Sequence, residues 1–119
     1  MPTKDTVTTY MAAWNEKDEA KRRKLIDQCW SDAGTYTDPM SDVQGKEALF
    51  ATIAGFHGQM PGAGIDLISG IDEHHGRIRF GWKLVNGPQP MEGIDVGVLS
   101  SYGKLDSIIG FWGANPAAG

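Results

Sequence analysis

The sequence has a single cysteine and no long apolar run, and each scarcity excludes a class of protein. Cys29 alone cannot form a disulfide within the chain, which favours a reducing compartment. No stretch approaches the roughly 20 apolar residues of a membrane span, and the start of the chain lacks the apolar segment of a signal peptide. The sequence therefore predicts a cytoplasmic protein that does not enter a membrane.

Positive charge is also scarce. Lys and Arg total 11 against 15 Asp and Glu, which gives a net charge of -4. This balance offers no basic surface to nucleic acid or anionic lipid. The four basic residues 21–24 have apolar neighbours at helical spacing, so we interpret them as the solvated face of a helix. We expect no nucleic-acid partner.

Motifs for common cofactors and nucleophiles are missing as well. The sequence contains no phosphate-binding loop, no dinucleotide-binding glycine pattern, no serine or cysteine nucleophile motif and no zinc-ligand spacing. His74 and His75 are adjacent but have no third ligand at a suitable distance, and Cys29 has no evident activating neighbour. We expect neither a metal nor a cofactor.

What is present is ordinary globular material. The 119 residues are 40% hydrophobic and 22% charged, which suits one domain with a substantial core. We predict a single domain over residues 1–119, with residues 115–119 as a loose tail.

The spacing of apolar residues predicts three helices in the first half of the chain. Val7, Tyr10, Met11 and Trp14 form one stripe on a first helix capped by Thr3. Asp18 can cap a second helix. A turn over residues 41–45 precedes a third, whose predicted buried side comprises Ala48, Leu49, Ile53 and Phe56.

From residue 65 the period changes to two. We predict strands over residues 65–71, 77–84, 91–101 and 105–113, with a turn at 72–76. Helices followed by such a meander indicate an α+β domain, in which the helices cover one face of a curved antiparallel sheet. The sheet is expected to form a cone whose mouth is a small-molecule pocket.

Three polar residues, Tyr10, Asp38 and Asp95, are candidates for a functional site. Tyr36 and Asp38 share one face of a short strand that ends at Pro39, and Asp95 interrupts the apolar run 93–99. Tyr10 lies within the apolar stripe of the first helix. Each has a plain structural alternative: Asp38 as a turn cap, Asp95 as a bulge residue facing solvent, and Tyr10 as a core tyrosine bonded to a carbonyl.

These residues also carry a family resemblance that spans nearly the whole chain. The chain resembles the nuclear transport factor 2-like (NTF2-like) superfamily, of the SnoaL-like polyketide cyclase and ketosteroid isomerase type. The resemblance rests on the order of several short motifs: Tyr10–Asn15, Asp38-Pro39, Gly45, Ile94-Asp95, Gly103-Lys104 and Phe111–Gly113.

The resemblance implies a cystatin-like cone and a set of site residues. By comparison with the steroid isomerases, Asp38 would be the base that moves a proton, and Tyr10 and Asp95 would donate hydrogen bonds to the oxyanion. The expected substrate-binding residues are Trp14, Tyr36, Ile53, Phe80, Trp82 and Trp112. The segment between Asn15 and Thr35 is longer than in the isomerases.

The sequence thus favours a cofactor-free enzyme that acts beside the carbonyl of a flat hydrophobic molecule. Two alternatives remain: a module that binds a hydrophobic ligand without chemistry, and a dimerisation module with an empty cone. If Asp95 faces inward, Ile94, Val96 and Val98 face outward, and this apolar stripe predicts a homodimer.

Overall fold

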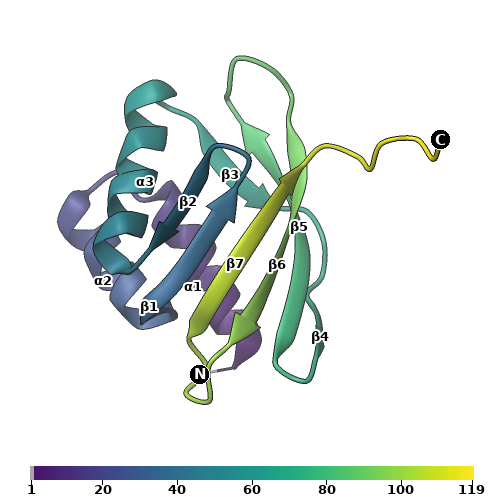
Figure 1. Ribbon diagram of the computed structural model, residues 1–119. Helices are drawn as coiled ribbons and strands as arrows, with labels where there is room; N and C mark the ends of the chain where they lie inside the picture. Colours follow the sequence, from purple (N-terminus) through teal and green to yellow (C-terminus); the bar gives the residue numbers. More distant parts are fainter. Residues whose placement is uncertain (1) are drawn as a thin grey trace.

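Helices on one side of a curved sheet make up the protein (Figure 1). The computed structural model describes residues 2–119. Its elements in chain order are α1 Thr3–Asn15, α2 Glu19–Cys29, β1 Trp30–Asp38, β2 Ser41–Gln44, α3 Lys46–Gln59, β3 Gly64–Leu67, β4 Asp72–His74, β5 Arg77–Val85, β6 Glu92–Leu99 and β7 Leu105–Trp112. No helix within this range is both long enough and apolar enough to cross a membrane.

The sheet confirms the predicted α+β class but is mixed rather than purely antiparallel. Its strand order is β2-β1-β7-β6-β5-β3, and β4 pairs with β5. The pair β1–β7 is parallel, whereas the other pairs are antiparallel. Parallel neighbours require a long crossover connection, and here all the elements from β2 to β6 lie between the two strands in sequence.

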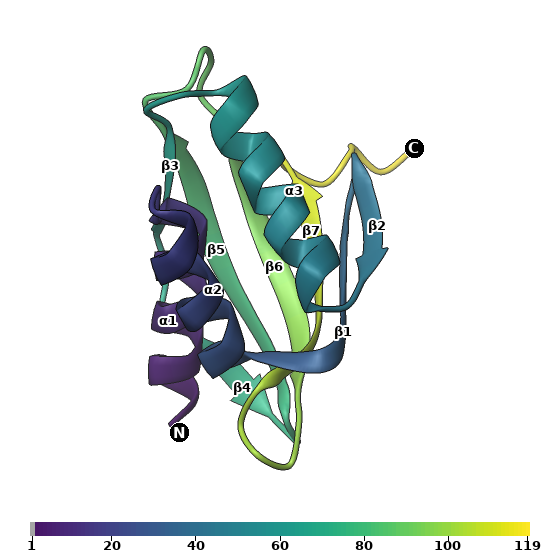
Figure 2. The same ribbon diagram turned by 90° about the vertical axis from the view of Figure 1, so that its left-hand side faces the viewer.

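The three helices cover one face of this sheet (Figure 2). The predicted stripe on α1 is buried, as are Leu49 and Ile53 of α3. On β5, residues at alternate positions from Ile78 to Leu84 are buried and those between them are more exposed, as the two-residue period predicted. The core therefore lies between the helices and the inner face of the sheet.

Two predicted turns also contain strands. Residues 41–44 form β2, which folds back along β1, and residues 72–74 form β4, which pairs with the start of β5. Both strands are short, exposed or half-buried, and too polar to show an apolar alternation. They are strands because they pair with β1 and β5, and a local sequence pattern does not reveal such pairing.

The helix starts differ in one case from the prediction. Thr3 lies inside α1, because Pro2 occupies the position before the first helical residue and provides no side-chain cap. Asp18 caps α2 as predicted, since its Oδ1 accepts the Lys21 backbone N–H at 3.0 Å.

Arg22 corrects the interpretation of the basic run as a solvated face. Its side chain is buried, and its Nε donates to the backbone oxygen of Glu16 at 2.9 Å. Its guanidinium also lies over the Phe50 ring, 5.4 Å from the centroid. Arg22 therefore satisfies the carbonyl groups where α1 turns into α2, and only its neighbours face water.

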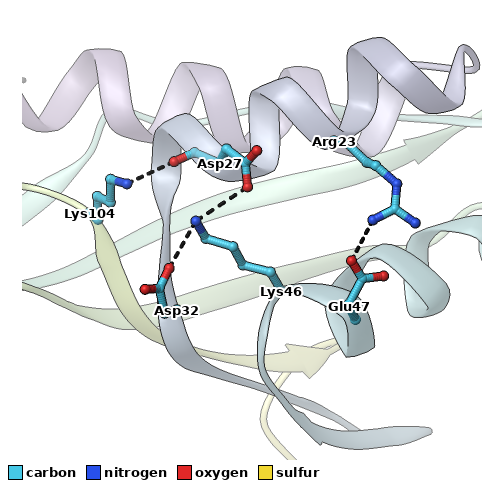
Figure 3. Close-up of polar contacts among 6 residues, drawn as sticks. All are labelled: Arg23, Asp27, Asp32, Lys46, Glu47 and Lys104. Carbon is cyan, nitrogen blue, oxygen red and sulfur yellow. Dashed lines mark hydrogen bonds and ion pairs between the residues drawn. The ribbon is translucent and has the colours of Figure 1, made fainter.

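Ion pairs at the surface fasten the start of α3 to the elements beside it (Figure 3). Lys46 Nζ lies 3.3 Å from Asp27 Oδ1 at the end of α2 and 3.0 Å from Asp32 Oδ1 on β1. Arg23 of α2 pairs with Glu47 at 2.6 Å. Exposed pairs of this kind contribute little to stability, so they orient α3 more than they stabilise it.

Candidate active site

A cavity of about 360 Å³ opens between α1, α3 and the inner face of the sheet. This volume lies within the range of small-molecule sites. The wall is largely aromatic rings and thioethers, from Trp14, Tyr36, Phe56, Trp82, Trp112, Met11, Met40, Met60 and Met91. Four of the six predicted substrate-binding residues, Trp14, Tyr36, Trp82 and Trp112, thus line it.

The other two predicted substrate-binding residues belong to the core. Ile53 and Phe80 are almost completely buried and do not line the cavity. Phe80 lies directly opposite Asp95 in the β5–β6 pairing. An apolar period identifies a side chain that points inward, but it does not distinguish the core from the cavity wall.

The three predicted catalytic residues lie on one cavity. Tyr10 reaches it from α1, Asp38 from the end of β1 and Asp95 from the middle of β6. The parallel pairing of β1 with β7, and the pairing of β7 with β6, bring the two carboxylates to the same region of the sheet.

Asp38 is half-buried and accepts two hydrogen bonds. Its Oδ2 accepts from the Tyr36 hydroxyl at 2.6 Å, and its Oδ1 accepts from the Met40 backbone N–H at 2.8 Å. Burial and the bond to Asp38 raise the pKa of Tyr36, so its phenol keeps its proton and remains a donor. Asp38 therefore caps the turn after β1 and also faces the cavity.

Asp95 is a buried carboxyl with one donor in contact. It is 7% exposed, and its Oδ1 accepts from the Trp82 indole N–H at 3.0 Å. Burial raises the pKa of Asp95 to about 7, the Trp82 hydrogen bond opposes this rise, and the nearby charge of Asp38 adds to it. Near neutral pH Asp95 is therefore available as a protonated donor.

Tyr10 carries the least satisfied polar group of the site. Its ring stacks on Trp30 with centroids 5.8 Å apart, and its hydroxyl is buried with no hydrogen-bond partner within residues 2–119. Burial raises the pKa of Tyr10, and the charge of Asp95 adds to the rise. The nearby Trp14 side chain acts in the opposite direction, although it forms no hydrogen bond with the Tyr10 hydroxyl. An unsatisfied buried hydroxyl costs about 1–3 kcal/mol. An oxygen atom of a ligand would remove this cost.

Gly110 is a site residue that the sequence reasoning missed. A Cβ at this position of β7 would lie 2.9 Å from Asp95 Oδ1 and 3.6 Å from Asp38 Cβ. The missing side chain therefore leaves the space that the Asp95 carboxyl group needs, while Asp38 lies at ordinary contact distance. A glycine inside an apolar strand can mark such a close approach, and this was the available signal.

Methionines at the edge of the cavity were also missed. Met40 follows β1, Met60 follows α3 and Met91 precedes β6, so all three lie in connecting segments outside any periodic pattern. Thioethers are flexible and polarisable, and they make favourable contacts with aromatic rings. These connecting segments therefore add adaptable apolar surface to the cavity wall.

Residues 2–119 give little support to a metal site or to a cysteine nucleophile. No group of three His, Cys, Asp or Glu side chains in this range is placed to hold a metal ion. Cys29 is buried, and burial raises the pKa of its thiol to about 12, which disfavours the thiolate that a nucleophile requires. The ionisable side chains in the cavity wall are those of Tyr10, Tyr36, Asp38 and Asp95.

Comparisons with known proteins give relatives of the same architecture. No protein-family model and no curated protein matches the chain. A crystal structure from Agrobacterium tumefaciens, described as a candidate isomerase of the SnoaL-like family, is 33% identical with a TM-score of 0.85 and covers 92% of this chain and 96% of its own.

More distant structures show the same fold. A candidate polyketide cyclase from Sinorhizobium meliloti is 12% identical, with a TM-score of 0.73 over 92% of this chain and 94% of its own. An NTF2-like protein from Exiguobacterium is 17% identical, with a TM-score of 0.76 over 92% of this chain and 99% of its own. Given its likeness to the Agrobacterium protein over almost the full length of both chains, this protein belongs to the SnoaL-like family, with the NTF2-like fold.

Proposed function

We propose that the protein catalyses proton transfer beside the carbonyl of a flat, apolar molecule, as an isomerase or an aldol-type cyclase does. The observation that carries the proposal is the convergence of Tyr10, Asp38 and Asp95 on one largely apolar cavity. The Agrobacterium relative, described as a candidate isomerase, agrees with this class of reaction.

The three side chains divide the chemistry. The carboxylate of Asp38 removes a proton from the carbon next to the carbonyl, and the electron pair moves to the carbonyl oxygen. The hydroxyl of Tyr10 and the protonated carboxyl of Asp95 donate hydrogen bonds to the resulting enolate. In an isomerase Asp38 returns the proton to another carbon of the enolate. In a cyclase the enolate carbon bonds to a second carbonyl carbon, and the oxygen of that carbonyl takes the proton from Asp38.

The cavity also limits the substrate. None of its lining residues is Lys or Arg, so it offers no cation to a phosphate. Its tryptophans and methionines favour a planar ring system over a sugar. We therefore propose a small hydrophobic carbonyl compound as the ligand.

A non-catalytic binding module is the second candidate, and one observation favours it. Both oxygens of Asp38 already accept hydrogen bonds, from Tyr36 and from the Met40 backbone. These donors occupy lone pairs of the carboxylate that a base would offer to the proton of the substrate. In this case the cavity would hold the same class of ligand without exchanging its protons.

Asp38→Asn separates the two candidates. The probe is 2-tetralone, a flat ketone, with binding followed by tryptophan fluorescence and exchange of its α-protons followed by NMR in heavy water. For the enzyme we expect binding to persist in the variant and the protein-catalysed exchange to fall by roughly 100- to 10,000-fold. The matched control is Asp42→Asn, an exposed aspartate on β2 outside the cavity, which should leave exchange unchanged. If wild type and Asp38→Asn bind the ketone and exchange its protons equally fast, the catalytic proposal is wrong and the binding module is the remaining candidate.

A further inference from the structure

The indole of Trp82 is placed against Asp95 by the pairing of β5 with β6. Trp82 lies opposite Gly93, two residues before Asp95 and on the same face of β6. A Cβ at Gly93 would lie 2.3 Å from Trp82 Cζ2, so the ring occupies the space that this glycine leaves. The indole Nε1 thereby reaches Asp95 Oδ1 at 3.0 Å.

The same oxygen of Asp95 is enclosed from the other side. Oδ1 lies 2.9 Å from the point where a Cβ of Gly110 would be, so it is held between β7 and the Trp82 ring. The indole N–H can only donate, and therefore Oδ1 has to act as the acceptor. In a protonated carboxyl group the carbonyl oxygen is the better acceptor, which leaves the proton on Oδ2.

We propose that Trp82 is a positioning residue, which holds Oδ1 of Asp95 as an acceptor so that Oδ2 carries the carboxyl proton and presents it to the ligand. This inference rests on the proposed role of Asp95 as a donor. It assigns to Trp82 a task beyond lining the cavity, since the indole selects the donating oxygen and limits how firmly the proton is held.

The hydrogen bond has a consequence for pH. Burial and the charge of Asp38 raise the pKa of Asp95, and the Trp82 bond lowers it, with a resulting value of about 7. The other ionisable groups that face the cavity are Tyr10 from α1 and Tyr36 from β1, whereas α3 and β7 place no ionisable side chain in its wall. Removing the indole N–H should therefore raise the pKa of Asp95.

Trp82→Phe tests the proposal, because it removes the N–H and keeps an aromatic ring. Aspartate labelled with ¹³C at the carboxyl carbon is followed by NMR against pH, and the Asp95 signal is assigned by its absence in Asp95→Asn. We expect the wild-type midpoint near 7. In Trp82→Phe it should be higher by about one pH unit, the effect of a lost hydrogen bond to a charged group. Trp112→Phe is the matched control, since Trp112 lines the same cavity, and its midpoint should equal that of wild type.

A second measurement needs no variant at position 82. In wild-type protein labelled with ¹⁵N, the indole N–H signal of Trp82 should shift with pH at the Asp95 midpoint, and that of Trp112 should not. An unchanged or lowered midpoint in folded Trp82→Phe, an equal shift in Trp112→Phe, or a Trp82 signal that ignores the titration would overturn the proposal.

These titrations use neither ligand nor turnover, so they are decided separately from the Asp38→Asn exchange test. If wild type exchanges the α-protons of 2-tetralone, the exchange should fall at high pH as Asp95 ionises. In Trp82→Phe the pH at which it falls should rise together with the midpoint of the Asp95 carboxyl. A profile that stays in place while the carboxyl midpoint moves would overturn the link between Trp82 and proton donation.

Discussion

Asp95→Asn should make the protein more stable, and increasingly so as the pH rises. The wild-type carboxyl is buried, so ionising it in the folded protein is unfavourable. Asparagine has nearly the same shape, cannot ionise, and offers the same carbonyl acceptor to the Trp82 indole. The variant therefore removes a buried charge while preserving the packing around it.

The magnitude follows from the pKa of Asp95, which rises on folding from its usual 3.8 to about 7. A group whose pKa is raised in the folded state contributes stability below its usual pKa, and this contribution is lost as pH rises through the folded value. At about 1.36 kcal/mol per pH unit, Asp95 loses about 4 kcal/mol in all, of which about 3 kcal/mol is lost between pH 5 and pH 8. This is a large fraction of the 5–15 kcal/mol typical of a folded domain.

Urea unfolding of both proteins at pH 5, 6, 7 and 8 measures the effect. The difference in free energy of unfolding, variant minus wild type, should grow by about 3 kcal/mol across this range. Asp66→Asn, an exposed aspartate on β3, is the control and should show no such growth. A difference for Asp95→Asn that is the same at pH 5 and pH 8 would refute the reasoning, because it would mean that Asp95 ionises as readily folded as unfolded.

Two further predictions concern the site and the assembly. Gly110→Ala should weaken 2-tetralone binding at least tenfold in a fluorescence titration, because the added Cβ would lie 2.9 Å from Asp95 Oδ1. The control Gly58→Ala has open space around its Cβ and should bind as wild type does. Equal affinities of Gly110→Ala and wild type would count against the role of Gly110. We also propose a homodimer formed through the outer sheet face, where Ile94 is 50% and Phe111 63% exposed. Phe111→Glu should then give a monomer by light scattering at micromolar concentration, and a monomeric wild type would contradict the proposal.

The sequence alone determined which faces of the main elements are buried. The helical spacing of Val7, Tyr10, Met11 and Trp14 and the alternation along β5 both reappear as buried faces. The direction of Asp95 stayed open at the sequence level, because Ile94, Val96 and Val98 form an apolar set on the opposite face of the same strand; the structure places Asp95 inward. These patterns succeed because burial of apolar surface dominates the local choice, and its period is visible in a short window.

Only the tertiary structure decided what those faces meet. The parallel pairing of β1 with β7 places Asp38 beside Gly110 and hence near Asp95, and no local pattern specifies that pairing. Met40 and Met60 reach the cavity from connecting segments that have no periodicity, while Ile53 and Phe80 have the expected inward positions but lie in the core. The physical reason is that strand partners and the convergence of loops depend on the free energy of the whole folded chain, whereas a period in the sequence reports only the direction in which a side chain points.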